Sequence, residues 1–217
     1  MGTRTDQSNP KKMIIGIIGG IGSGKSEIAE YFAKKGGKLI QADKLGHEAH
    51  QQEHIRQMIV QRWGERVLDE QNQLDRKKLG SIVFASAVER ANLEMMVFPW
   101  IEQRIRQEIK EADDNPSYQF VVLDAAIMVE AKWNKICSKM VYVHTPRYLR
   151  LQRLINQRGW SQQELFQRET AQLTLTEKAT LADVAIDNSH SIEASQKQID
   201  RLLTSWQLAN ECSVRNY

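Results

Sequence analysis

Short runs of apolar residues alternate along this chain with longer segments in which apolar residues recur every three or four positions. A short apolar run predicts a buried strand, and the longer periodicity predicts an amphipathic helix. Five segments have the strand pattern: 13–18, 38–41, 118–123, 139–144 and 182–187. Because helical patterns separate these segments, the chain predicts an α/β fold, with a five-stranded parallel sheet and helices on both faces.

The segment 53–113 is the longest helical stretch in the sequence. Pro99 interrupts its pattern, so a kink or a restart is expected before Trp100, and the composition of 113–117 predicts a loop. A connection between two strands needs fewer helical residues than this. We therefore expect an inserted lobe that binds a substrate, with a helical bundle that only supports the sheet as the alternative.

The segment 19–26, GGIGSGKS, connects the first predicted strand to a helix and fits the pattern G-x-x-x-x-G-K-[ST]. Its glycines let the backbone curl so that successive N–H groups point inward, and the helix N-terminus adds partial positive charge. Lys25 would reach the terminal phosphates of a nucleotide, and the Ser26 hydroxyl would bind Mg²⁺. An ordinary glycine-rich turn is the alternative, but the position of the motif between strand and helix favours a P-loop NTPase fold.

Two carboxylates follow predicted strands, at the edge where ligands bind in parallel α/β sheets. Asp43 follows the second strand and is either a general base that orients an acceptor hydroxyl or the N-cap of a helix over 44–50. Asp124 ends the third strand and resembles the second metal-positioning motif of P-loop proteins. It is followed by Ala125, where many motor ATPases have a glutamate, which disfavours a motor or a hydrolase. Glu130 either faces the cleft or lies on a plain helix surface, and we favour the helix surface.

The helix predicted after the fourth strand carries a row of arginines, Arg147, Arg150 and Arg153, with Arg158 further on. A solvated helix face is the ordinary explanation for such a row. A guanidinium also binds phosphate through two hydrogen bonds, so we favour a mobile lid over the nucleotide. The core side of the same helix is expected to present Tyr148, Leu151, Leu154 and Ile155.

Composition limits the class of protein. The chain has 217 residues, of which 41% are hydrophobic and 26% charged, which is typical of a soluble globular protein, and no apolar run reaches membrane-spanning length. A net charge of +3 suits an anionic small molecule and is too weak to indicate nucleic acid. Cys137 and Cys212 lie far apart without a metal-binding pattern, which predicts reduced thiols and a cytoplasmic protein.

Taken together and in this order, the motifs resemble the dephospho-coenzyme A kinase family from about residue 13 to residue 206. Besides the phosphate loop, the resemblance depends on Gln41-Ala42-Asp43 with His47, Leu74-Asp75-Arg76, Leu93-Glu94 with Phe98-Pro99, the lid residues Arg153, Arg158 and Gln172, and the closing strand from Ala182 to Asn188. Glu27 stands where the family usually has threonine, and Phe98 stands where it has histidine. These departures bear on acceptor affinity more than on the type of reaction.

The resemblance implies phosphorylation of the ribose 3′-hydroxyl of the small molecule dephospho-coenzyme A, with ATP and Mg²⁺. It also implies that Asp43 acts on the acceptor hydroxyl. The implied site residues are Lys25, Asp43 and Arg153 for catalysis; Gly20, Gly22, Ser23, Gly24, Lys25, Ser26, Glu27, Arg158 and Asn188 for ATP; Asp43, His47, Asp75 and Arg76 for the acceptor; and Ser26 for Mg²⁺.

On this interpretation, residues 13–210 form a single P-loop kinase domain. Its expected parts are a core of 13–43, 118–157 and 180–210, a helical acceptor-binding insertion at about 44–117 and a lid at about 158–179. The polar segment 1–12 has no apolar stretch of a signal peptide and is expected to be a disordered tail, as is 211–217 at the other end.

The expected protein is a monomer or weak oligomer that binds neither nucleic acid nor membrane. One alternative is another nucleotide or small-molecule kinase on the same scaffold. A second is a nucleotide-dependent switch, which would need a guanine-binding motif; the segment 134–137 offers Cys137 where that motif has aspartate.

Overall fold

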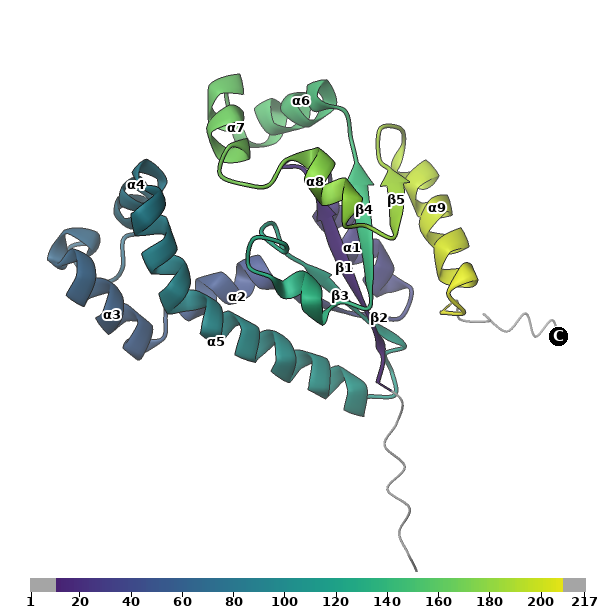
Figure 1. Ribbon diagram of the computed structural model, residues 1–217, viewed down its shortest axis with the longest axis horizontal. Helices are drawn as coiled ribbons and strands as arrows, with labels where there is room; N and C mark the ends of the chain where they lie inside the picture. Colours follow the sequence, from purple (N-terminus) through teal and green to yellow (C-terminus); the bar gives the residue numbers. More distant parts are fainter. Residues whose placement is uncertain (1–10, 209–217) are drawn as a thin grey trace, which may run out of the picture. The chain divides into compact units, whose positions relative to one another are not determined.

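The computed structural model describes residues 11–208, shown as a coloured ribbon in Figure 1. The predicted tail 211–217 lies outside the described residues, as does 1–10. Lys12, which the sequence pattern assigns to the tail, is instead anchored: its ammonium donates to the carbonyls of Ala112 at 2.6 Å and Asp113 at 2.8 Å. A cation at the C-terminal end of a helix satisfies carbonyls that lack an intrahelical partner.

The centre of the fold is a five-stranded parallel sheet in the order β2-β3-β1-β4-β5, which confirms the predicted α/β class. Strand β1 pairs in parallel with β3 and β4, and β4 pairs in parallel with β5. The strands are β1 (Met13–Gly19), β2 (Gly37–Gln41), β3 (Phe120–Asp124), β4 (Lys139–His144) and β5 (Val184–Asp187).

Helices connect these strands, as the alternating pattern predicts. Two short 3₁₀ turns, Glu65–Val67 and Trp133–Ile136, lie among them. The helices are α1 (Lys25–Lys34), α2 (Ala42–Ala49), α3 (Glu53–Trp63), α4 (Arg76–Ala85), α5 (Ala87–Asp114), α6 (Arg147–Arg158), α7 (Gln162–Glu169), α8 (Leu175–Thr180) and α9 (Ile192–Ser205). Within residues 11–208, no helix combines the length and apolar character that crossing a lipid bilayer requires.

The main core lies where α1 and α9 pack on one face of the sheet. Alternate residues of a strand share a face, so β1, β3 and β4 each contribute residues two positions apart. Phe32 of α1 meets Phe120 of β3 edge to face, with ring centroids 6.4 Å apart. The fully buried members of this core are Ile15, Ile17, Ile28, Ala29, Phe32, Phe120, Val122, Val141, Val143 and Ile199, joined by Ile186 and Leu203. This packing fixes the carboxyl ends of the central strands.

The chain divides into two compact units. The sheet unit comprises the residues up to Ile40 and from Glu108 onward, and the helical unit comprises 41–107. The helical unit contains α2, α3, α4 and most of α5, and its own buried residues include Ile55, Ile59 and Leu79.

Helix α5 differs from the sequence expectation at two places. It continues without a break through Pro99, so a restart before Trp100 is wrong, and it includes Asp113 and Asp114, which the composition assigned to a loop. Proline removes only one backbone donor from a helix. The long apolar face, with Val97 and Ile101 buried at 6% and 3% exposure, holds the helix together across that position.

Candidate active site

The loop between β1 and α1 has the curled backbone that phosphate binding requires. Gly22 and Gly24 have φ angles of 78° and 87°, in the left-handed region that favours glycine. Space is also limited, because a Cβ on Gly22 would lie 2.9 Å from the carbonyl oxygen of Arg150. The loop is closed by a hydrogen bond of 3.1 Å from the Ser23 N–H to the carbonyl of Gly20. These glycines are therefore required by conformation and by contact.

Three donors from distant parts of the chain hold the Ser23 carbonyl in place. Thr145 Oγ1 donates to it at 3.0 Å, Asn188 Nδ2 at 2.8 Å and Arg153 Nη1 at 3.3 Å. In a trans peptide the following N–H points opposite to the carbonyl. Fixing the Ser23 carbonyl therefore turns the Gly24 N–H toward the other side of the loop, where a phosphate group would be bound.

Asn188 and Arg153 thus support the loop from behind. Asn188 is 2% exposed, and its Oδ1 accepts a hydrogen bond of 2.9 Å from Ser195 Oγ, so both ends of the amide are engaged within the protein. Arg153 also donates to the Asn188 carbonyl at 2.9 Å. Their direct contact with a nucleotide stays a prediction. Thr145, which the sequence reasoning missed, shares this role, and only its place directly after β4 could have suggested it.

Ser26 and Asp124 meet at the mouth of the loop. The Ser26 hydroxyl, in the first turn of α1, donates to Asp124 Oδ2 at 2.8 Å, and Asp124 is 7% exposed at the end of β3. Hydroxyl and carboxylate oxygens are the ligands that Mg²⁺ prefers. Among the described residues, three or more His, Cys, Asp or Glu side chains nowhere form a metal cluster.

Lys25 and Glu27 lie in the same first turn of α1. Lys25 Nζ donates to the Gly20 carbonyl at 3.4 Å, so its ammonium group folds over the loop. Glu27 is exposed. The N-terminus of α1 and the ammonium of Lys25 lie together at the loop, and both favour the binding of an anion there.

Helix α6 does not present the side that the sequence predicts. Tyr148 and Ile155 are 70% and 49% exposed, so their assignment to the core is wrong, whereas Leu154 is buried at 2%. Arg150, which the pattern placed in the arginine row, is also 2% exposed. The buried face of α6 is therefore partly polar, and a periodicity of apolar residues alone does not detect it.

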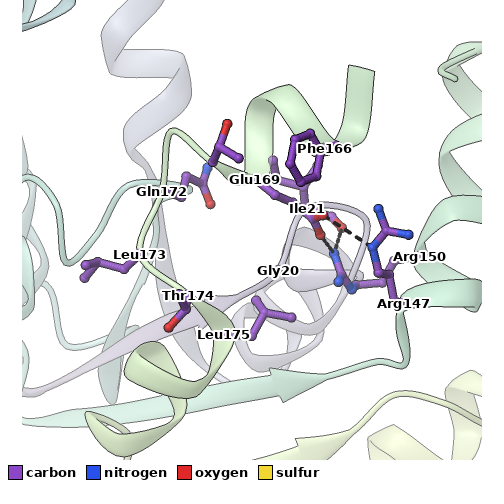
Figure 2. Close-up of a pocket in the computed structure, with 11 residues that line it drawn as sticks. Gly20, Ile21, Arg147, Arg150, Phe166, Glu169, Gln172, Leu173, Thr174 and Leu175 are labelled. Atoms are coloured by element: carbon purple, nitrogen blue, oxygen red, sulfur yellow. Dashed lines mark hydrogen bonds and ion pairs between the residues drawn. The ribbon is translucent and has the colours of Figure 1, made fainter. Parts of the chain in front are cut away.

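A cavity of about 520 Å³ lies between the phosphate loop and helices α6, α7 and α8 (Figure 2). Gly20 and Ile21 form its floor on the loop side, and Arg147 and Arg150 line it from α6. Its remaining wall consists of Phe166, Glu169, Thr170, Gln172, Leu173, Thr174 and Leu175. Two guanidinium groups therefore line a cavity that adjoins the loop.

The segment predicted as a lid contains two further arginines, and both contact one aromatic ring. The guanidinium carbon of Arg158 lies 5.3 Å from the ring centroid of Trp160, and that of Arg168 lies 4.3 Å from it. Such cation–π contacts are weak at exposed sites. In the same segment, Gln172 Oε1 accepts a hydrogen bond of 2.9 Å from Lys178 Nζ.

Glu130 is not on a plain helix surface, so that expectation is wrong. It forms an ion pair of 3.0 Å with Lys178, which is only 2% exposed, and its Oε1 accepts a hydrogen bond of 2.9 Å from the Leu173 N–H. A buried ammonium needs such partners because water cannot solvate it. The loop after β3 is thereby connected to the segment before α8.

In the helical unit, Asp43 lies inside the first turn of α2 and not at its N-cap, which is Gln41. The alternative role of Asp43 as the helix cap is therefore wrong. Its carboxylate is exposed and benefits from the positive end of the helix dipole. His47 follows four residues later, which places it on the same face of α2.

His47 and Arg76 are brought together within the helical unit. The Arg76 guanidinium lies 2.7 Å from His47 Nε2, and because a guanidinium has no acceptor, it is the donor in this hydrogen bond. Asp75 is the N-cap of α4 and accepts from the N–H groups of Lys77 at 2.8 Å and Lys78 at 3.1 Å. The hydrogen bond from the Lys78 N–H is the main reason that the pKa of Asp75 is lowered. A contact of Asp75 with substrate stays a prediction.

Comparisons with known proteins agree on one family. A family model described as dephospho-CoA kinase matches residues 13–194. A dephospho-CoA kinase of Carboxydothermus hydrogenoformans is 36% identical over 200 residues, which are 89% of this chain and 94% of that protein. One from Helicobacter pylori is 33% identical over 192 residues, covering 88% of this chain and 96% of the relative.

Solved structures show the same fold. A crystal structure of a Thermus thermophilus protein superposes with a TM-score of 0.77 at 27% identity, covering 89% of this chain and 97% of the other. The structure of a dephospho-CoA kinase from Campylobacter jejuni gives a TM-score of 0.65 at 24% identity over 89% of this chain and 96% of that one.

Proposed function

This chain belongs to the dephospho-CoA kinase family, and we propose that it transfers the γ-phosphoryl group of ATP to the ribose 3′-hydroxyl of dephospho-CoA. It is a kinase, so its reaction needs a phosphoryl donor and an acceptor. The observation that carries the proposal is the phosphate loop, whose Ser23 carbonyl is fixed by three donors beside the Ser26–Asp124 pair. Phosphoryl transfer depends on alignment and on neutralising charge, which such a loop supplies.

We assign the neutralisation of the phosphate charges to Lys25, the loop amides and Mg²⁺. Arg158 would add positive charge when the segment 158–179 closes over ATP, and Arg153, which contacts the loop from α6, would add its charge beside the loop. Closure excludes water, so that ATP is not simply hydrolysed. Gly20, Gly22, Glu27 and Asn188 complete the proposed ATP site by shaping or flanking the loop.

The proposed Mg²⁺ ligand is the Ser26 hydroxyl, and Asp124 would hold it in position. Bound Mg²⁺ would neutralise the developing charge on the transferred group. The contact of 2.8 Å between the two side chains fits this role, because it fixes the direction of the hydroxyl oxygen.

Replacing Asp124 by asparagine is expected to raise the Mg²⁺ concentration for half-maximal rate by about tenfold or more, because outer-shell partners of metals commonly contribute that much affinity. The measurement is the initial rate against Mg²⁺ at saturating ATP. Asp200→Asn is the matched control, since its carboxylate forms a surface ion pair with Lys35 at 2.8 Å. An Mg²⁺ requirement of wild-type size in Asp124→Asn contradicts the assignment.

The acceptor is proposed to bind through the helical unit. Asp43 would orient or deprotonate the 3′-hydroxyl, and His47, Asp75 and Arg76 would bind the acceptor. The exposed face that carries Asp43 and His47 supports this assignment, as does the joined His47–Arg76 pair. A guanidinium held in this way suits an anionic acceptor, because it donates several hydrogen bonds in a fixed plane.

The remaining features are proposals of the same kind. We propose a single kinase domain over 13–210 with an acceptor-binding insertion at about 44–117, acting as a monomer or weak oligomer in the cytoplasm. Reduced thiols are typical of that compartment. Cys137 is a free cysteine, and burial raises the pKa of its thiol to about 12, so the thiol stays protonated and unreactive.

An acceptor screen tests the function. The purified protein is incubated with ATP and Mg²⁺ and with dephospho-CoA or a nucleoside monophosphate, and ADP formation is followed. We expect ADP formation to depend on dephospho-CoA. Phosphorylation of a nucleoside monophosphate without that of dephospho-CoA favours another kinase on this scaffold. ATP turnover that no acceptor increases favours a nucleotide-dependent switch.

A further inference from the structure

Arg150 joins three separate segments of the sheet unit. Its Nε donates to the Thr145 carbonyl at 3.2 Å, and its Nη1 donates to the Ile21 carbonyl at 3.0 Å and to Glu169 Oε1 at 2.6 Å. The side chain is 2% exposed. One buried guanidinium therefore contacts the end of β4, the phosphate loop and the last residue of α7.

Glu169 is the carboxylate that balances this buried charge. Its Oε1 accepts from Arg150, and its Oε2 lies 3.6 Å from Nε of Arg147, so the carboxylate lies between two guanidinium groups (Figure 2). Its side chain is 23% exposed, against 44% for Arg147. The shorter contact, between Glu169 and Arg150, is the buried one. Removing one partner of a buried ion pair leaves the charge of the other partner uncompensated.

The phosphate loop is packed tightly against α6 at the same place. A Cβ on Gly20 would lie 3.0 Å from Arg150 Nη1, and a Cβ on Gly22 would lie 3.0 Å from two side-chain carbons of Leu154. A shift of Arg150 would therefore move the Ile21 carbonyl or leave it without its donor. Since Glu169 holds Arg150 from α7, the position of α7 and the shape of the loop depend on each other.

We propose that Arg150 and Glu169 are positioning residues that couple the position of helix α7 to the nucleotide affinity of the phosphate loop. Glu169 acts on the loop through Arg150, whose Nη1 contacts both. The inference rests on the proposed function in one respect, that ATP binds at this loop. Coupling of this kind is reciprocal, so ATP bound at the loop also stabilises α7.

The variant Glu169→Gln distinguishes the coupling from simple electrostatics, because the two predict changes of opposite sign in the Kd for ATP. Glu169 faces the cavity beside the loop, so as a bare charge it would repel the phosphates, and its neutralisation would tighten ATP binding. Through the coupling, neutralisation loosens Arg150 and weakens ATP binding. We expect the Kd for ATP with Mg²⁺, measured by calorimetry without acceptor, to rise on the order of tenfold.

Two further variants complete the experiment. Glu169→Asp keeps the charge but shortens the side chain, so it also loses the 2.6 Å contact and is expected to weaken ATP binding. Glu30→Gln removes an exposed carboxylate of α1 and is the matched control, with an unchanged Kd. Melting curves without nucleotide test whether each variant is folded. If Glu169→Gln is not folded, the test is made with Glu169→Asp.

A positioning role also predicts that the substitution changes the KM for ATP more than it changes kcat. The KM for ATP should rise with the Kd in Glu169→Gln, while kcat changes by less than about threefold and the KM for the acceptor stays constant. Protection of the α7 amides from hydrogen exchange by ATP should be lost in the same variant. A Kd that is unchanged or lower in both Glu169 variants overturns the inference. If wild type binds ATP but phosphorylates no dephospho-CoA, only the proposed function fails.

Discussion

Lys25→Ala is expected to lower kcat for phosphoryl transfer by about 10²- to 10³-fold or more. The ammonium of Lys25 folds over the phosphate loop in the first turn of α1, where the N–H groups and the helix dipole already favour anions. In the transition state, charge spreads over the oxygens of the transferred group, and a fixed cation there stabilises it more than the ground state. Alanine removes the cation and leaves the loop backbone.

The measurement is single-turnover and steady-state kinetics with saturating ATP and acceptor. Lys34→Ala is the matched control, because Lys34 is an exposed lysine in the last turn of the same helix and should keep its wild-type kcat. If folded Lys25→Ala turns over within a few-fold of wild type, the loop is not the site of the chemistry.

Asp43→Asn is expected to cause a loss of similar size, about 10²- to 10³-fold in kcat. Asparagine has nearly the same shape as aspartate, and α2 should tolerate it in its first turn. It carries no charge and cannot accept the proton of an attacking hydroxyl. Because Asp43 is proposed to act on the acceptor, the KM and Kd for ATP should remain near wild type, which separates this variant from those of the loop.

Glu48→Gln provides the control for this variant, since Glu48 is an exposed acid on the same helix and lies outside the proposed site. We expect it to leave kcat unchanged. Near-normal turnover in a pure, folded Asp43→Asn sample would remove Asp43 from the mechanism and leave alignment by the loop as the main source of catalysis.

Local patterns predicted the parts of this structure that depend on neighbours in sequence. The strands, the curled loop and its helix follow from apolar runs and from the spacing of glycine, lysine and serine. The contact of Ser26 with Asp124 does not follow from such a pattern, because the two residues lie 98 positions apart; the sequence places Asp124 only at the edge of the sheet where ligands bind. Family resemblance added the identity of the acceptor, which no pattern of apolar residues contains.

The wrong expectations have a common cause in partners that are distant in sequence. Arg150 is buried because Ile21, 129 positions away, accepts its hydrogen bond, and Lys178 is buried because Glu130 pairs with it. Neither pairing leaves a local signal. Tyr148 is exposed because the buried face of α6 is the one that carries Arg150 and Leu154. Helix α5 passes Pro99 because tertiary packing outweighs one missing donor.

The contacts of the Ser23 carbonyl add a role to residues that the sequence assigned to ATP binding or catalysis, because the structure shows them holding the loop. Thr145, Asn188 and Arg153 all donate to it. A residue that holds the loop is indistinguishable in sequence from one that touches the nucleotide, since either lies at the carboxyl end of a strand or on the adjoining helix. Their contacts in the folded chain show that they hold the Ser23 carbonyl, and a direct contact of Asn188 or Arg153 with the nucleotide stays a prediction.

The central claim is that a fixed loop aligns the γ-phosphoryl group of ATP with one hydroxyl of dephospho-CoA. The most direct test is phosphorus NMR of the products formed from ATP, Mg²⁺ and dephospho-CoA. The expected result is one new phosphomonoester, on the ribose 3′ position, formed in equal amount with ADP and absent with Lys25→Ala. ADP without a new phosphomonoester, or a phosphate on a different hydroxyl, would contradict the claim.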